Sequence, residues 1–219
     1  MSTLLNPHQH GAGVRICTDT DQLSQIHEPE VEVVLWLREV SPLLASFLDN
    51  IDISSEPRNN FHLQQGKLHK QLHEHLQSFE VNNPDVYQAW LNDMAYLVDV
   101  YQEVVSNPSP RVRLDFLHNN ACKRFHRDNM TIRLITTYIG PGTEWLLGEH
   151  LKVGPERTDI FKVQDVQHVP RFTVGLFKGL KYPGNLPKVF HRSPPISGSN
   201  QHRFVLCLDD IPAPSTPHT

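Results

Sequence analysis

The apolar positions in the first half of the chain recur mainly at helical spacing. Residues 32–37 are an exception, because this short β-branched run predicts a strand. Ser41 and Pro42 then supply the capping residue and the first-turn proline of a short amphipathic helix. Apolar side chains three or four positions apart predict two further helices, over residues 68–79 and 84–105.

The spacing changes after residues 106–110, where the Ser-Asn-Pro-Ser-Pro segment ends the long helix because proline lacks the backbone donor. Residues 111–116 and 130–138 alternate apolar and polar side chains, which is the period of a strand. Short strands without helices between them favour an antiparallel barrel or jelly roll. Further strand candidates, separated by Gly and Pro clusters, are residues 159–163, 172–177, 188–191 and 203–209.

These patterns divide the chain into four segments. Residues 1–26 are polar and aperiodic, so we expect a poorly ordered lead-in there. Residues 27–108 are the mainly helical part, residues 109–210 are the part rich in strands, and residues 211–219 are a tail expected to be frayed. We expect residues 27–210 to form one integrated domain, in which the helices cover an otherwise exposed face of the sheet.

Length and charge exclude several classes of protein. A chain of 219 residues can bury a sizeable core without disulfides. Its 20 Lys and Arg against 24 Asp and Glu give a net charge of −4, so we expect neither nucleic acid nor a membrane as a partner. The sequence does not identify the substrate, whether a small molecule or a protein, nor the oligomeric state.

Cysteine usage and the N-terminal segment favour a cytoplasmic protein. Cys17, Cys122 and Cys207 are odd in number and show no CxxC spacing, which is typical of a reducing compartment. Residues 1–13 lack the basic and apolar segments of a signal peptide, and the longest purely apolar stretch, residues 33–37, is far too short to span a membrane.

His126 and Asp128 are the first part of a candidate metal site. Because they lie two positions apart, both side chains leave the same face of an extended segment and can reach one ion. His191 ends a later predicted strand and is the third candidate ligand. Two imidazoles and one carboxylate form the facial set that holds Fe(II) and leaves positions open for other ligands. An ordinary surface or core pair is the alternative for an isolated His-x-Asp triplet.

Arg203 and Tyr138 are candidates for binding a co-substrate. Arg203 begins the last predicted strand, and its forked, permanently charged guanidinium would bind a carboxylate at two points, as a 2-oxo acid on the metal requires. Tyr138 follows the His-x-Asp triplet on a strand and could offer its hydroxyl to the same co-substrate. A core tyrosine with a satisfied hydroxyl is an equal alternative.

Four neighbouring residues are candidates for an extra ligand or a supporting role. Cys122 or Glu144 could complete a closed zinc site, in which a fourth protein ligand takes the open position. The alternatives are a small buried cysteine and a turn packed on the helical half. Arg192 and Ser193 flank the distal histidine and are expected to fix its imidazole.

GPGTEW at residues 140–145 and HRSPP at residues 191–195 are specific sequence blocks. With four further blocks, they resemble a bacterial family known as domain of unknown function 1826. The resemblance names no activity, but it implies a link to zinc homeostasis through the neighbourhood of the family's genes. The blocks are CKRFHRD at residues 122–128, RLITTY at 133–138, GPGTEW at 140–145, KG at 178–179, HRSPP at 191–195 and RFVLCLD at 203–209.

More distantly, the order of His-x-Asp, strand, turn, strand, His and Arg resembles the Fe(II)/2-oxoglutarate oxygenases of the prolyl-hydroxylase type. That resemblance implies Fe(II) ligands at His126, Asp128 and His191, and a 2-oxoglutarate anchor at Arg203. It also implies a double-stranded β-helix over residues 109–210. The expected fold class is therefore α+β, with a jelly-roll or cupin-like core and an N-terminal helical part packed on it.

Three functional interpretations follow. The leading one is a cytoplasmic metal-dependent oxygenase that uses Fe(II) and a 2-oxo acid. The second is a non-catalytic zinc- or metal-binding protein of metal homeostasis, with the same three ligands and Cys122 or Glu144 as the fourth. The third is a degenerate barrel that binds a small anion or a protein partner without metal.

Overall fold

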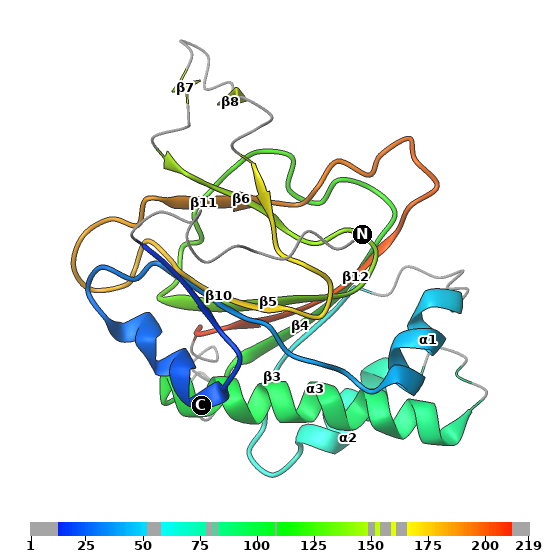
Figure 1. Cartoon of the computed structure of the whole chain (residues 1–219). Helices are drawn as coiled ribbons and strands as arrows, with labels where there is room; N and C mark the ends of the chain where they lie inside the picture. Colours follow the sequence, from blue (N-terminus) through cyan, green and yellow to red (C-terminus); the bar gives the residue numbers. More distant parts are fainter. Residues whose placement is uncertain are drawn as a thin grey trace, which may run out of the picture.

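Three layers make up the fold of this protein: helices, a large sheet and a smaller sheet (Figure 1). In Figure 1 the helices lie below the large sheet, and the smaller sheet lies above it. The described part is a mixed α/β structure built around the large sheet. The computed structural model describes residues 13–51, 58–77, 81, 83–107, 109–148, 152–153, 159–160 and 166–211.

The large sheet has seven strands in the order β1-β2-β10-β5-β12-β4-β3. Strands β1 and β2 pair in parallel, and every other neighbouring pair is antiparallel. Strands from the first half of the chain form both edges of the sheet, and strands from the second half form its centre. The strands are β1 (Val14–Cys17), β2 (Val33–Trp36), β3 (Arg58–His62), β4 (Arg111–Leu117), β5 (Ile132–Ile139), β10 (Val174–Lys178) and β12 (Arg203–Asp209).

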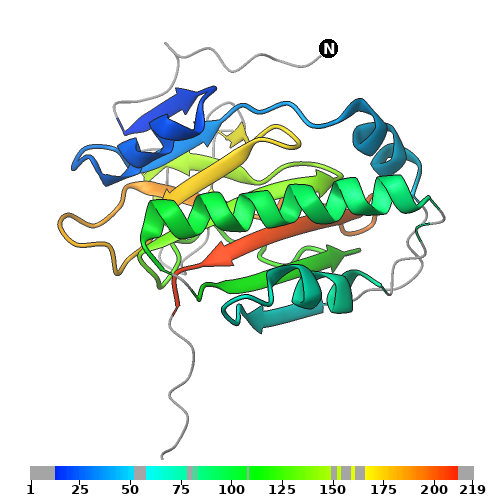
Figure 2. The same ribbon diagram turned by 90° about the horizontal axis from the view of Figure 1, so that it is seen from below.

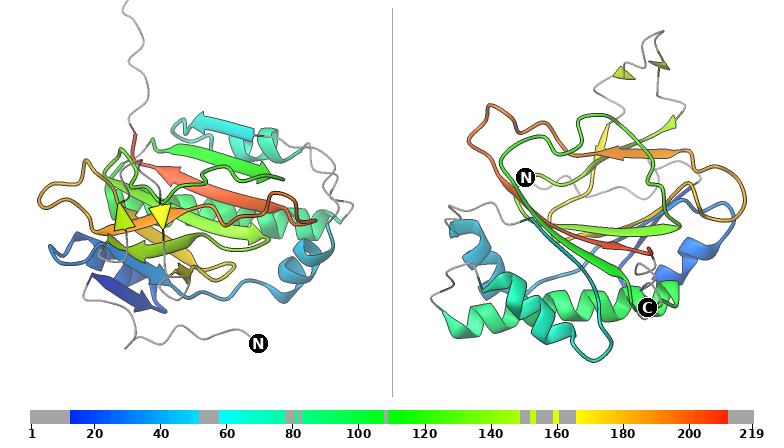
Figure 3. Two further views of the ribbon diagram at one scale, coloured as in Figure 1. Left: turned by 90° about the horizontal axis from the view of Figure 1, so that it is seen from above. Right: turned by 180° about the vertical axis from the view of Figure 1, so that it is seen from behind.

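The smaller sheet has the strand order β11-β6-β9 and faces the large sheet across an apolar layer. Trp145 and Val189 of the smaller sheet belong to one buried cluster with Ile135 and Val205 of the large sheet. The two sheets therefore form a sandwich, which Figure 3 shows from above and from behind. The remaining strands are β6 (Glu144–Leu147), β9 (Gln167–His168), β11 (Val189–Arg192) and the separate pair β7 (Lys152–Val153) and β8 (Asp159–Ile160).

The helices cover the outer face of the large sheet (Figure 2). The Asn83 side chain caps α3 by accepting hydrogen bonds from the backbone N–H groups of Asp85 and Val86. At the other end Ser106 adopts a left-handed conformation, with φ of 51°. No helix among the described residues is both long and apolar enough to cross a membrane. The helices are the 3-10 helix η2 (Thr20–His27) and the α-helices α1 (Pro42–Asn50), α2 (Leu68–Leu76) and α3 (Pro84–Val105).

Helix α3 packs its apolar side on the two central strands of the sheet. Trp90 is fully buried, and its ring lies 5.1 Å from that of Phe204 on β12 and 6.2 Å from that of Tyr138 on β5, in edge-on contacts. Tyr101 donates a buried hydrogen bond of 2.7 Å to the backbone carbonyl of Ile132 on β5. These contacts join α3 to β5 and β12 and so fix the centre of the sheet.

The structure confirms most of the predicted helices and strands, but the N-terminal part contributes more strand than its sequence indicates. Residues 13–26, expected as a poorly ordered lead-in, form β1 and η2, with Leu23 and Ile26 buried. The predicted helix over residues 68–79 ends at Leu76. The sequence patterns predict none of the strands β1, β3, β6, β7 and β9. Parts of the predicted segments lie outside the described residues. These parts are residues 1–12, 78–80, 161–165 and 212–219.

Replacing Trp90 by Ala should lower the free energy of unfolding by about 3–5 kcal/mol, because the change leaves a cavity between α3 and the central strands. Leu43→Ala on α1 is the control, since Leu43 is 52 % exposed and its loss should cost no more than about 0.5 kcal/mol. Chemical denaturation of both variants measures the difference, and equal losses would contradict the packing described for α3.

Candidate metal centre

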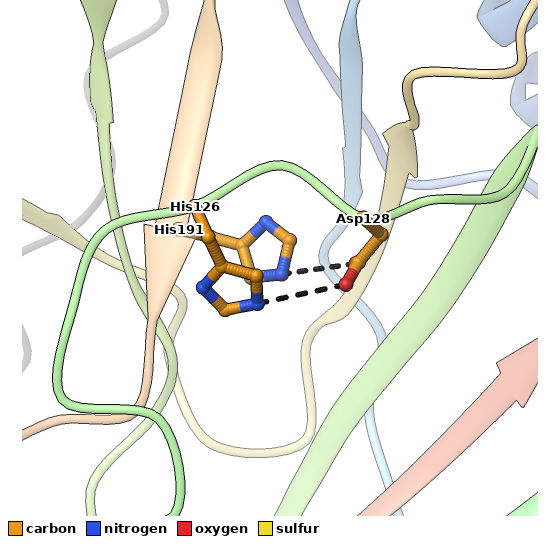
Figure 4. Close-up of side chains that lie close together, drawn as sticks. All are labelled: His126, Asp128 and His191. Carbon is orange, nitrogen blue, oxygen red and sulfur yellow. Dashed lines mark ion pairs between the residues drawn. The ribbon is translucent and has the colours of Figure 1, made fainter.

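His126, Asp128 and His191 come together where the smaller sheet meets the segment that joins β4 to β5 (Figure 4). His126 and Asp128 lie on this connecting segment, and His191 lies on β11. The backbones of His126 and His191 form an isolated antiparallel bridge with two N–H···O hydrogen bonds of 3.0 Å. This bridge ties the connection to the smaller sheet and turns both imidazole rings toward Asp128.

The distances between the three side chains suit a metal ion. His126 Nε2 lies 3.5 Å from Asp128 Oδ1, and His191 Nε2 lies 3.0 Å from Asp128 Oδ2. One ligand atom of each residue lies within 4.8 Å of the others. Ligand atoms at right angles around an ion, with bonds of about 2.1 Å, lie about 3 Å apart. The three residues therefore fit a first-row metal with little rearrangement.

Two details of hydrogen bonding also fit a metal site. His126 Nδ1 lies 3.0 Å from the carbonyl oxygen of Arg124, which only accepts, so Nδ1 carries the proton and Nε2 is the free nitrogen of the neutral ring. Asp128 Oδ2 is buried and has no hydrogen-bond partner among the described residues, and His191 Nε2 lies 3.0 Å from it. A buried carboxylate oxygen without a donor is costly, and an ion beside it would remove that cost.

A buried arginine holds Asp128 in this position. Arg133 is 6 % exposed, and it donates from Nη1 to Asp128 Oδ1 at 2.5 Å and from Nε to Asp209 Oδ1 at 2.6 Å. Asp209 is fully buried and also accepts from Arg111. Charge alternates along this chain of four residues, so both buried carboxylates are compensated while Asp128 keeps Oδ2 free.

The protonation states suit metal binding. Burial alone would raise the pKa of Asp128, but His126, His191 and Arg133 together hold it well below its ordinary value, so the carboxylate is charged. The Asp128 carboxylate, 3.5 Å away, raises the pKa of His126, so a metal ion at Nε2 would compete with a proton there. Burial lowers the pKa of His191, which favours the neutral imidazole that binds metals.

A cavity of about 280 Å³ opens beside His126 and His191. Its wall is formed by β4, β5, β12 and the segments next to the two histidines, and it is rich in positive charge. Three of its arginines have a carboxylate partner. These pairs are Arg113 with Asp115, Arg133 with Asp128, and Arg192 with Glu144.

Arg203 lines the same cavity, and no carboxylate among the described residues forms an ion pair with it. Its Nε donates to the Pro141 carbonyl at 2.7 Å, Nη1 donates to Ser193 Oγ at 3.1 Å, and Nη2 lies 3.2 Å from the hydroxyls of Thr137 and Thr143. Burial lowers the pKa of Arg203 to about 10, so the guanidinium stays charged at neutral pH. A buried cation with only neutral partners is a place where a carboxylate would bind well.

The Gly-Pro-Gly turn after β5 brings two of these neutral partners to Arg203. Gly140 has φ of 79°, a conformation that favours glycine, and a Cβ there would lie 1.9 Å from the carbonyl oxygen of His202. This close passage allows Pro141 and Thr143 to reach the guanidinium. The GPGTEW block therefore has a structural role beside the cavity.

Tyr138 does not lie in the cavity, which corrects the expectation that its hydroxyl meets a co-substrate. Tyr138 is fully buried on the helix side of β5, and its hydroxyl donates to Asp93 of α3 at 2.5 Å. Side chains alternate along a strand, so Arg133 and Thr137 face the smaller sheet while Tyr138 faces the helices.

Neither candidate for a fourth ligand belongs to the His-Asp-His group. Cys122 is exposed in the wall of the cavity, and Glu144 accepts from Arg192 Nε at 2.6 Å. Ser193 accepts from Arg203. Arg192 and Ser193 thus orient two other charged side chains, and the distal imidazole is fixed by its backbone bridge.

Arg133 and Asp209 are site residues that sequence reasoning did not single out. Each occupies a position in an alternating strand where a polar side chain ordinarily faces solvent. One feature of the sequence pointed to Arg133. The next side chains on the same face of its strand are Ile135 and Thr137, so Arg133 is the charged residue among uncharged ones there. A lone charge on such a strand needs a buried partner.

The chain belongs to the family described as "Protein of unknown function (DUF1826)", whose model matches residues 17–209. This match confirms the family resemblance seen in the sequence blocks. No curated protein matches the chain.

Several solved structures are similar over most of the chain. A Pseudomonas putida prolyl-4-hydroxylase is 8 % identical over 87 % of this chain and 96 % of its own, with a TM-score of 0.41. A C-terminally truncated Neurospora crassa protein, solved in apo form, is 10 % identical over 96 % and 100 %, with a TM-score of 0.47. The Fe(II)/α-ketoglutarate-dependent dioxygenase TqaL is 12 % identical over 78 % and 74 %, with a TM-score of 0.37. At these identities and TM-scores the similarity carries no argument about function.

Replacing Arg133 by Met should lower the free energy of unfolding by about 3–5 kcal/mol, because Asp128 and Asp209 would lose the charge that compensates them in a buried environment. Arg124→Met is the matched control, since Arg124 is exposed and its side chain should contribute no more than about 0.5 kcal/mol. Denaturant titration of the two variants decides the matter, and a stable Arg133→Met protein would argue against the alternating charge chain.

Proposed function

We propose that this protein is a metal-dependent oxygenase that uses Fe(II) and a 2-oxo acid such as 2-oxoglutarate. His126, Asp128 and His191 would hold the metal, and Arg203 would bind a carboxylate of the 2-oxo acid. The sandwich that positions these residues would be a double-stranded β-helix.

The proposal rests on the meeting of two features in one cavity. The first is a set of two imidazoles and one carboxylate, which leaves positions on a metal open to other ligands. The second is the buried guanidinium of Arg203 in the wall beside the histidines, without a described carboxylate partner. An open metal near an unpaired cation fits a ligand that chelates at one end and carries a carboxylate at the other, as a 2-oxo dicarboxylic acid does.

Each side chain has a defined task in this proposal. Fe(II), when bound, would supply the dioxygen and one-electron chemistry that protein side chains lack. Arg133 keeps Asp128 charged and oriented, and the carbonyl of Arg124 fixes the tautomer of His126. Arg203 binds and orients the acid. The apolar layer between the sheets limits the access of water from the inner side.

A closed zinc site is the competing possibility, and it needs a fourth protein ligand. The described His-Asp-His group has three members, and the carboxylate of Glu144 is already paired with Arg192. Cys122 lies in the same cavity wall but outside the group. The geometry therefore favours the open site.

Asp128→Asn and His191→Ala should each weaken Fe(II) binding by more than about 100-fold, because each change removes one of three protein ligands. Cys122→Ser and Glu144→Gln should stay within about threefold of the wild-type affinity if the site is open. Anaerobic calorimetry of the metal-free protein measures all four, with one ion expected per chain. Unchanged affinity in His191→Ala would exclude this metal site, and a large loss in Cys122→Ser or Glu144→Gln would favour closed zinc coordination.

Arg203→Gln should retain Fe(II) but weaken the binding of 2-oxoglutarate to the Fe(II)-loaded protein by at least about 30-fold, or about 2 kcal/mol, because a buried charge pair is lost. Lys123→Gln, which removes an exposed charge from the same connecting segment, should bind both ligands normally. The same calorimetry is repeated with 2-oxoglutarate as the titrant. Equal binding to wild type and Arg203→Gln, or equal binding with and without metal, would remove the 2-oxo acid from the proposal.

A further inference from the structure

A second cavity, of about 710 Å³, lies apart from the candidate metal centre. It is bounded by the loop that joins β10 to β11 and by residues that precede β2, at one end of the sandwich where orange and blue segments meet in Figure 1. Five side chains in its wall decide what it could bind. They are Arg127, Lys178, Tyr182, Leu186 and Phe190.

Three cations line this cavity without a carboxylate partner among the described residues: Arg127, Lys178 and the exposed Lys188. Lys178 is 7 % exposed, donates a hydrogen bond of 2.7 Å to the carbonyl of Glu28, and has its Nζ 4.2 Å from the centre of the Tyr182 ring. Arg127 donates one hydrogen bond to a backbone carbonyl, and its guanidinium lies 4.7 Å from the centre of the Phe190 ring. Lys178 and Arg127 both keep N–H groups for which the described residues supply no acceptor.

The glutamates near Lys178 are already engaged elsewhere. Glu28 and Glu30 lie 3.7 and 3.6 Å from Arg15 Nη2. Glu32 accepts from two backbone N–H groups at the start of β11, at 2.5 and 2.8 Å. Glu30 and Glu32 also line the cavity, but none of the three glutamates lies within ion-pair distance of Lys178, so its ammonium group has no carboxylate partner among the described residues.

The rest of the wall is mixed, with Glu30, Glu32, Asn185 and Lys188 as its other polar side chains and an apolar part beside them. Leu147, Leu186 and several prolines line the cavity together with the two aromatic residues. Leu186 is 64 % exposed, so a large apolar side chain stands uncovered at this site. Such a surface next to fixed polar groups is typical of a small-molecule site.

We propose that this cavity binds a small organic anion with an apolar ring or chain and one acidic group, whether carboxylate, sulfonate or phosphate. Arg127 and Lys178 would bind the acidic group, and Leu186 would cover the apolar body. Arg127 lies between the candidate ligands His126 and Asp128 in the sequence, but its side chain lines the second cavity. An anion bound there would therefore contact the same chain segment that carries two of the metal ligands. The proposal does not depend on the metal or on the oxygenase activity.

The test uses 8-anilinonaphthalene-1-sulfonate, whose fluorescence rises in apolar surroundings, titrated into the full chain. N-phenyl-1-naphthylamine is an uncharged relative that reports apolar contact alone. Arg127→Gln and Lys178→Gln should each weaken binding of the sulfonate at least about fivefold and leave binding of the neutral probe within about twofold. Lys181→Gln, which removes an exposed charge outside the cavity, should change neither.

Leu186 provides a second test that leaves the buried residues untouched. Because its side chain is exposed, Leu186→Lys and Leu186→Glu should fold as wild type, and they should tighten and weaken binding of the sulfonate by about threefold, respectively. Unchanged sulfonate binding in these two variants would overturn the proposal. Equal loss of both probes in Arg127→Gln or Lys178→Gln would overturn it as well, because the effect would then be structural. Loss of sulfonate binding in Arg203→Gln would assign the anion to the metal cavity instead.

Discussion

The ion pair between Arg133 and Asp128 is the interaction on which the rest of the candidate site depends. A carboxylate as buried as that of Asp128 is tolerated only with a compensating partner, and Arg133 supplies one while leaving Oδ2 free. Arg133 is itself anchored to Asp209 on β12. The large sheet thus sets the position of a ligand carried by a connecting segment, and the bridge between His126 and His191 sets the other two.

Side chains alternate along the central strands, so one face of these strands packs against the helices and the other face carries residues of the candidate site. On the helix side of β5 and β12, Tyr138 and Phe204 pack beneath Trp90 of α3. On the other side, Arg133 contacts the metal centre and Arg203 lines its cavity. Because the helix side is densely packed, the strands are held firmly enough to keep two buried guanidinium groups in place. Strand β11 of the smaller sheet adds His191 and Arg192 to the wall of the cavity.

Local patterns in the sequence predicted the helices and the three candidate ligands, because these depend on spacing within a short segment. The His-x-Asp alternation put His126 and Asp128 on one face, and the end of a predicted strand marked His191. The lone charge of Arg133 on its strand face was visible in the sequence, but its partner was not, since Asp209 lies on another strand and is reached only through tertiary pairing. Strands β1 and β3 are short and partly polar, so their hydrophobic patterns do not predict them. They form by pairing with β2 and β4 at the edges of the sheet. The position of Tyr138 depended on which face of β5 turns to the helices, which alternation alone does not decide.

The most direct test of the metal centre is to locate the ion itself. Crystals prepared anaerobically with Fe(II) would be measured on both sides of the iron absorption edge, so that anomalous differences mark the metal. We expect one peak per chain within about 2.3 Å of His126 Nε2, His191 Nε2 and Asp128 Oδ2. A peak at other residues, or no ordered iron at saturating Fe(II), would contradict the assignment of these three side chains as the metal ligands.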